Sequence, residues 1–76
     1  MNSNALKARL KLMGKTVEDI VRELRKVKNV KMSRETFYRK LKGASDFTRK
    51  EILALSELLE LSDSDTMNIF FNEKVS

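Results

Sequence analysis

Three features of the sequence predict an all-α fold: apolar residues recur three and four positions apart, both glycines follow such segments, and proline is absent. No segment shows the apolar and polar alternation of a half-buried strand. A chain of 76 residues has room for only one small core, so we expect a single domain over residues 1–76. Cysteine and histidine are absent, which excludes disulfides and the usual zinc sites and leaves helix packing as the source of stability.

The first predicted helix covers Asn4–Met13 and ends at Gly14. Glycine suits the position after a helix, because it adopts the left-handed conformation that a helix end requires. The apolar residues of this segment recur at helical spacing and form one buried stripe. This stripe consists of Leu6, Leu10 and Met13.

The second helix is expected to begin at Thr16, whose hydroxyl can cap the next turn. Asp19, three residues later, places negative charge at the positive end of the helix. The apolar pattern continues far enough for the helix to reach Lys28, with Asn29 as its left-handed terminator. The predicted core residues of this helix are Ile20, Val21, Leu24 and Val27.

The third helix is expected to begin at Ser33 and to end at Gly43. Met32 and Phe37 occupy the two positions of a hydrophobic staple around its start. Phe37 and Leu41, four residues apart, are predicted to face the core. The opposite face then presents polar and charged side chains to solvent, namely Arg34, Glu35, Tyr38, Arg39 and Lys42.

Two more helices follow in the acidic part of the chain. Thr48 and Glu51 can form a reciprocal capping box, and Phe47 and Ile52 can form the staple beside it. The helix that begins at Thr48 is expected to bury Ile52, Leu55 and Leu59. The last helix begins at Ser62 and carries Asp63, Asp65, Met67, Ile69, Phe70 and Phe71. Its three final apolar residues are expected mostly to close the core, with a partner or dimer surface as the alternative.

Positive charge is concentrated in the first two-thirds of the chain. Residues 1–50 contain 15 basic and 5 acidic side chains (15 − 5 = +10), whereas residues 51–76 contain 1 and 6 (1 − 6 = −5). The two parts sum to the net charge of +5. A charge carried only for solubility explains the total but not this segregation, so we expect the first part to attract a polyanion.

The outer face of the third helix has the groups that reading DNA requires. Arg34 or Arg39 can donate two hydrogen bonds to guanine, and Glu35 can accept one from the amino group of cytosine. Tyr38 can pack on a thymine methyl group or bind phosphate. The alternative is that this is the ordinary solvated face of a surface helix.

In order and spacing, these segments resemble the Cro/repressor-type (XRE-like) helix-turn-helix domains of phages and mobile elements. The matching segments are residues 6–9, 13–20, 33–37 and 47–62, followed by Ile69-Phe70-Phe71. The resemblance implies a compact five-helix, lambda-repressor-like domain with its third helix in the major groove, often as a homodimer on a palindromic operator. It assigns base contacts to Arg34, Glu35, Tyr38 and Arg39. Phosphate contacts are expected at Thr16, Arg25, Lys26, Lys28, Lys31, Thr36, Lys42 and Ser45.

The chain departs from the family pattern in two places. Residues 25–32 make the connection between the second and third helices longer than in the family, so we expect an extended turn. Four bases and no acid lie in this insert, which is expected to lengthen the second helix and to form a basic loop that reaches the DNA backbone; a solvated loop is the alternative. Val17 replaces a polar residue that contacts phosphate in many relatives.

The function expected from these features is that of a sequence-specific DNA-binding transcriptional regulator in the cytoplasm of a bacterium or a phage-infected host cell. The alternative is a protein-binding modulator or antirepressor that docks on a partner repressor with the same fold. RNA is a weaker third candidate, because one exposed tyrosine provides no stacking platform.

Enzymatic activity is not expected. The sequence lacks histidine, the commonest general base, and cysteine, the best nucleophile. It also has no glycine-rich phosphate loop. No cofactor, metal ion or small-molecule substrate is expected either. No apolar run approaches the roughly 18 residues of a spanning helix, so no membrane association is expected.

Overall fold

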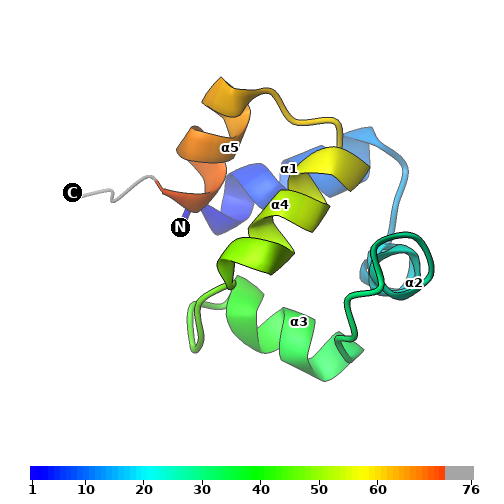
Figure 1. Cartoon of the computed structure of the whole chain (residues 1–76). Coiled ribbons are helices and arrows are strands. Elements are labelled where there is room, and N and C mark those ends of the chain that lie inside the picture. The colour runs from blue at the N-terminus through cyan, green and yellow to red at the C-terminus, as the bar shows by residue number, and fades with distance from the viewer. Residues whose placement is uncertain (72–76) are drawn as a thin grey trace.

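Five α-helices form the computed structural model, which describes residues 1–71 (Figure 1). They are α1 (Ser3–Leu12), α2 (Val17–Lys28), α3 (Arg34–Leu41), α4 (Arg49–Leu58) and α5 (Asp63–Phe70). The described range contains no strand, which confirms the all-α prediction. The end of the domain expected over residues 1–76 lies outside the described residues. None of the described helices combines the length and the apolar character needed to cross a membrane.

Every helix begins at a side-chain cap. Four of these caps are the residues at which the sequence predicts a helix to begin, and for two of them, Thr16 and Thr48, the sequence also predicts the capping side chain. In each case a side-chain oxygen of the capping residue accepts a hydrogen bond from a backbone N–H of the first turn. The caps are Asn2, Thr16, Ser33, Thr48 and Ser62. Thr48 and Glu51 form the predicted capping box, and Thr16 and Asp19 form a second one. These short helices therefore have starts that their own sequence specifies.

Left-handed residues end the helices that the sequence predicted to end this way. Gly14, Asn29 and Gly43 have φ angles of 69°, 57° and 90°. A further left-handed residue, Glu60, has a φ angle of 54° and follows α4. Sequence reasoning missed it, because glutamate is not among the residues that favour this conformation.

The five helices enclose a single apolar core. Its members are Leu6, Leu10, Ile20, Leu24, Val30, Met32, Phe37, Leu41, Phe47, Ile52, Ala54, Leu55, Leu59, Ile69 and Phe70. Three rings link α3 to α5 through the core, because Phe47 makes edge-to-face contacts with Phe37 at 5.5 Å and with Phe70 at 5.6 Å between ring centres. Ile69 and Phe70 thus close the core as expected.

One predicted core residue is wrong, and two others lie at the edge of the core. Val27 is 64% exposed, because Ile20 and Leu24 set the buried face of α2 and nothing in the described chain covers the valine side of its last turn. Met13 and Val21 pack against the core while remaining partly exposed. Phe71 is exposed, so only part of the final apolar run is core.

The arrangement of the helices leaves the outer side of α3 open. In Figure 1, α1 and α5 lie on one side of the molecule and α3 on the opposite side, with α4 between them and α2 seen nearly end-on. α2 packs against both α3 and α4, and α5 packs against α1 and α4. No other described helix covers the outer side of α3 (Figure 1).

Candidate nucleic-acid interface

The outer face of α3 presents the four side chains that were predicted to read bases. Arg34, Glu35, Tyr38 and Arg39 are all exposed. Phe37 is completely buried and Leu41 nearly so, which fixes the rotation of the helix on its scaffold. The predicted orientation of this helix is therefore confirmed, while contact with bases stays a prediction.

The segment between α2 and α3 is ordered by two buried apolar residues. α2 takes up the insert as far as Lys28, so only residues 29–33 connect it to α3. Val30 and Met32 are buried, and the N–H of Val30 donates to the carbonyl oxygen of Leu24 at 2.8 Å. Lys31 lies between them in sequence and is exposed. The connection is therefore an anchored loop with one outward lysine.

A shallow groove lies between α2 and the beginning of α3. Its lining includes four bases and one acid, which makes it positively charged. The lining residues are Glu18, Val21, Arg22, Arg25, Lys26, Met32, Ser33 and Arg34. The structure thus brings Arg25 and Lys26, two of the predicted phosphate contacts, next to Arg34, a predicted base contact. Arg22 belongs to the same groove and was missed by the sequence analysis.

Acids of the first turn of α2 hold two of the three arginines that line this groove, Arg22 and Arg34. A guanidinium nitrogen of Arg34 lies 2.5 Å from the carboxylate of Glu18, and one of Arg22 lies 3.2 Å from that of Asp19. The side chains of Arg34 and Glu18 are 57% and 62% exposed, so water screens their attraction and the pair contributes little to stability. No sequence pattern indicated the Arg34–Glu18 pair, because its partners are 16 positions apart.

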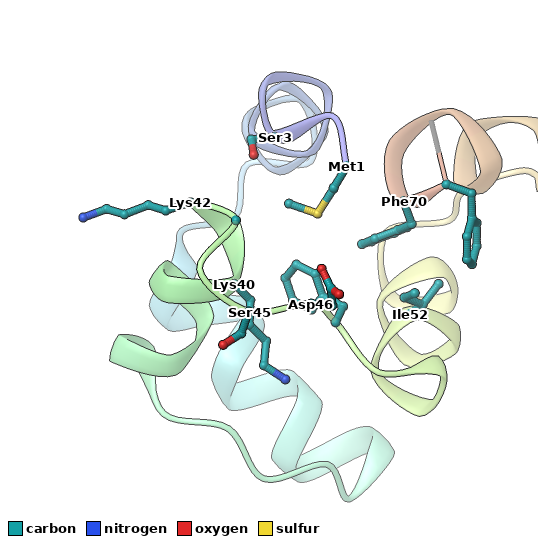
Figure 2. Close-up of a pocket in the computed structure, with 11 residues that line it drawn as sticks. Met1, Ser3, Lys40, Lys42, Ser45, Asp46, Ile52 and Phe70 are labelled. Atoms are coloured by element: carbon teal, nitrogen blue, oxygen red, sulfur yellow. The ribbon is translucent and has the colours of Figure 1, made fainter. Parts of the chain in front are cut away.

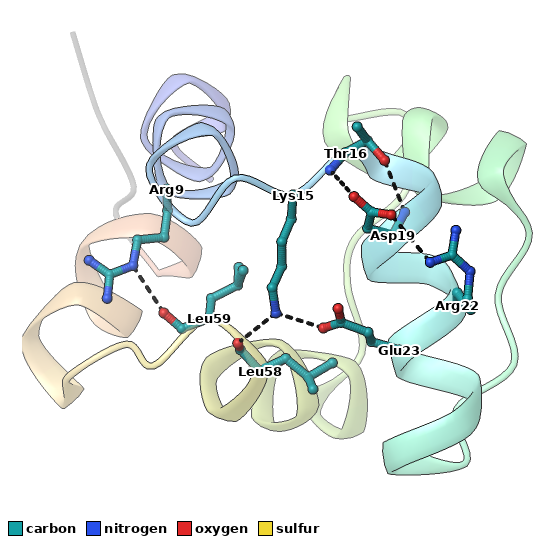
Figure 3. A network of polar contacts seen from close by, with 8 residues as sticks. All are labelled: Arg9, Lys15, Thr16, Asp19, Arg22, Glu23, Leu58 and Leu59. Atoms are coloured by element: carbon teal, nitrogen blue, oxygen red, sulfur yellow. Dashed lines mark hydrogen bonds and ion pairs between the residues drawn. The ribbon is translucent and has the colours of Figure 1, made fainter.

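Hydrogen bonding perturbs the Asp19 carboxylate. The pKa of Asp19 is lowered from 3.8, chiefly by the hydrogen bond that the carboxylate accepts from the N–H of Thr16, with smaller contributions from the Thr16 side chain and from Arg22. Figure 3 shows the carboxylate between Thr16 and Arg22. Asp19 therefore acts mainly as a helix cap.

Some of the other predicted phosphate contacts already have partners within the protein, and others extend into solvent. The hydroxyls of Thr16 and Thr36 accept hydrogen bonds within the caps of α2 and α3. Lys28 is paired with Glu57 of α4. Ser45 is half-buried in the loop after α3, whereas Lys42 is exposed and extends away from the body of the molecule (Figure 2).

A second hollow of about 510 Å³ lies at the far end of α3. Figure 2 shows Met1, Ile52 and Phe70 around it, with Asp46 and Ser45 on the loop after α3. Two of the predicted phosphate contacts, Lys42 and Ser45, line this hollow. The mixed apolar and polar lining gives no convergent set of groups for a particular ligand.

Three further bases support the fold, and sequence reasoning missed their roles. Arg9 donates to the carbonyl oxygen of Leu59 at 3.0 Å (Figure 3) and to that of Glu60 at 2.9 Å, at the end of α4. Lys15 is paired with Glu23 at 2.6 Å and also reaches the end of α4. Lys40 is paired with Glu51 at 2.6 Å at the start of α4.

Within residues 1–71 no group of side chains is assembled that could hold a metal ion. Comparison of the chain with protein-family models, curated proteins and solved structures finds no match in any of the three. The resemblance to XRE-like domains therefore stays a prediction from the residues quoted for it.

Proposed function

We propose that this protein binds double-stranded DNA and regulates transcription, with α3 in the major groove and α2 together with the loop after it on the phosphate backbone. One observation carries the proposal. Five bases along α2, the connecting loop and α3 are exposed and form no ion pair within the described part of the chain. They are Arg25, Lys26, Lys31, Arg39 and Lys42.

The proposed mode of binding follows from the way α3 is held. Its core side chains fix it against α2 and against Phe47, which precedes α4. Its open side can enter a groove about 12 Å wide that admits a helix. Arg34 and Arg39 would donate to guanine, Glu35 would accept from cytosine, and Tyr38 would contact a thymine methyl group. This docking is that of a helix-turn-helix protein, with α2 and α3 as the two helices.

The size of the domain favours binding as a homodimer. A single module of this kind buries only about 600–1,000 Å² of protein surface on DNA. Two copies on a palindromic operator would double the contacts, as in phage-type repressors. The protein would then act in the cytoplasm of a bacterium or of a phage-infected host cell.

The salt dependence of binding tests the electrostatic basis of the proposal. Five phosphate contacts predict a slope of about −4 to −5 per protomer in a plot of log K against log salt concentration. Fluorescence anisotropy with a labelled random-sequence duplex measures this slope. A slope near zero would contradict the proposal.

Two double variants of equal charge locate the surface. Arg25→Ala/Lys26→Ala removes two bases from the groove. Lys7→Ala/Lys11→Ala removes two exposed bases from α1, which lies on the side of the molecule opposite α3 (Figure 1). The groove variant is expected to lose affinity and to flatten the slope by about 2, whereas the α1 variant is expected to bind almost as the unmodified protein does. Equal losses would mean that only the net charge matters.

A protein-binding modulator on the same fold is the second candidate function. Met67 and Phe71 favour it, because both are exposed and lie four residues apart at the end of α5. Absence of binding to random duplex DNA at low salt would favour this candidate over DNA binding.

A further inference from the structure

Glu18 faces the basic groove and has no part in the capping box of its helix, although it lies in the first turn, where negative charge interacts favourably with the helix dipole. The capping box of α2 is formed by Thr16 and Asp19. Among the described residues, the one ion-pair partner of the Glu18 carboxylate is Arg34, the first residue of α3. An acid in this place also lies beside the groove that the proposed function assigns to DNA phosphates.

We infer that Glu18 competes with DNA for Arg34, an inference that rests on the proposed function. In the free protein the carboxylate holds the guanidinium, and on binding an acceptor on DNA replaces it. Carboxylates, phosphates and the O6/N7 edge of guanine all accept the paired hydrogen bonds of a guanidinium, so the replacement conserves the geometry of the contact. Both side chains are more than half exposed, so the pair can open without rearrangement of the core.

The competition makes Glu18 a positioning residue that lowers the affinity of the site. Removing its charge has two separable effects: Arg34 becomes free in the unbound protein, and the repulsion between the carboxylate and nearby phosphates disappears. The first effect depends on Arg34 and the second does not. An exposed ion pair of this kind accounts for about a two- to fivefold change in an equilibrium constant.

A double-mutant cycle isolates the first effect. The four proteins are the unmodified chain, Glu18→Gln, Arg34→Ala and the double variant, each titrated with a random-sequence duplex at low salt by fluorescence anisotropy. Glu18→Gln is expected to raise affinity in both backgrounds. The gain is expected to be about two- to fivefold larger where Arg34 is present, because only there does the substitution release an arginine.

The opposite result would overturn the inference while leaving DNA binding intact. If Arg34 stayed on Glu18 in the complex, it would shield the acid from phosphates, and the gain would be equal or larger in the Arg34→Ala background. Failure of the unmodified protein to bind duplex DNA at low salt would instead overturn the proposed function itself. The two failures are therefore distinguishable.

A charge control and a folding control complete the experiment. Asp63→Asn makes the same change in net charge on α5, where the acid is exposed, and is expected to leave affinity almost unchanged. A gain equal to that of Glu18→Gln would attribute the effect to net charge and overturn the inference. The melting temperature of Glu18→Gln is expected to stay within a few degrees of the unmodified protein, because an exposed pair adds little to stability.

Discussion

The two ends of α4 and the outer surface of α2 and α3 use the same kinds of side chain for different purposes. At the ends of α4, Arg9, Lys15 and Lys40 contact carboxylates or carbonyl oxygens of the protein itself. On α2 and α3, bases such as Arg25 and Arg39 are exposed and form no ion pair within residues 1–71. The comparison teaches that a count of basic residues overstates the charge available to a polyanion, because the fold determines which bases remain free.

The difference follows from the central position of α4. This helix contacts α2 and α5, so its end is enclosed by other elements and its last carbonyl groups need donors from the protein. Arg9 and Lys15 provide them, and a positive charge there also interacts favourably with the helix dipole. α3 has an open side, and its outward bases face water instead.

Lys40→Ala is expected to have the largest effect on stability. Its side chain is only 12% exposed, that of Glu51 is 13% exposed, and Lys40 also lies 5.9 Å from the centre of the Phe47 ring. Removing Lys40 leaves the largely buried Glu51 carboxylate without its ion-pair partner, with the N–H of Thr48 as its remaining hydrogen-bond donor, which costs about 3 kcal/mol. A core of this size supplies only about 3–5 kcal/mol in total, so the variant should be close to unfolding in a urea titration.

Arg39→Ala is the matched control, because Arg39 is the next residue on α3 and is exposed. It is expected to change the free energy of unfolding by no more than about 0.5 kcal/mol. An equal loss of stability in the two variants would remove the distinction between structural and free bases.

Arg34→Ala is expected to have the next largest effect, on DNA recognition. Loss of a paired contact to guanine should cost about 1–3 kcal/mol on the preferred operator and relax sequence preference at one position. Lys26→Ala should instead weaken binding to all sequences alike and reduce the salt slope by about 1. Competition titrations between a selected operator and random DNA measure both quantities. Unchanged discrimination in Arg34→Ala would mean that this end of α3 does not read bases.

Arg9→Ala tests the other end of α4. The substitution removes two hydrogen bonds to carbonyl oxygens at the end of the helix, so we expect a loss of about 1.5 kcal/mol in the free energy of unfolding. Lys11→Ala removes an exposed base from α1, the helix that carries Arg9, and is expected to be nearly neutral. Urea denaturation distinguishes the two, and a neutral Arg9→Ala would contradict the role assigned to Arg9.

Local signals allowed most of the fold to be predicted from the sequence. Caps such as Thr48 with Glu51 and terminators such as Asn29 act within a few residues, so the helix boundaries could be predicted. Val27 shows the limit of periodicity, because its spacing fits the core face of α2 while no other element of residues 1–71 covers it. Val30 was missed for the opposite reason: it is a buried residue of the loop between α2 and α3, and a loop has no periodic pattern to reveal it.

The candidate site was less predictable, because long-range pairing determines it. The exposed face of α3 could be predicted, because Phe37 and Leu41, four residues apart on this helix, define its buried face. The pairs of Lys28 with Glu57 and of Arg34 with Glu18 join residues 29 and 16 positions apart. Such pairs depend on how helices pack, and sequence spacing does not reveal them.

Asp19→Asn is expected to have the smallest effect, a small loss of stability near neutral pH that disappears in acid. Its folded-state pKa is lowered from 3.8, chiefly by the hydrogen bond from the N–H of Thr16. The ionised carboxylate therefore stabilises the fold at pH values above the unfolded-state pKa, and this contribution is lost as the pH falls through the lowered folded-state pKa. Urea midpoints measured from about pH 6 to about pH 2 should fall less steeply for Asp19→Asn than for the unmodified protein.

Thr16→Ala sharpens this test and returns to the comparison between structural and free charges. The variant loses the hydroxyl but keeps the backbone N–H, which is the larger cause of the lowered pKa, so most of the acid dependence should remain. Identical acid limbs for Asp19→Asn and the unmodified protein would contradict the capping role. Of the two neighbouring acids at the start of α2, Asp19 would then have no more part in the fold than Glu18, and the division of structural and free charges would not extend to this turn.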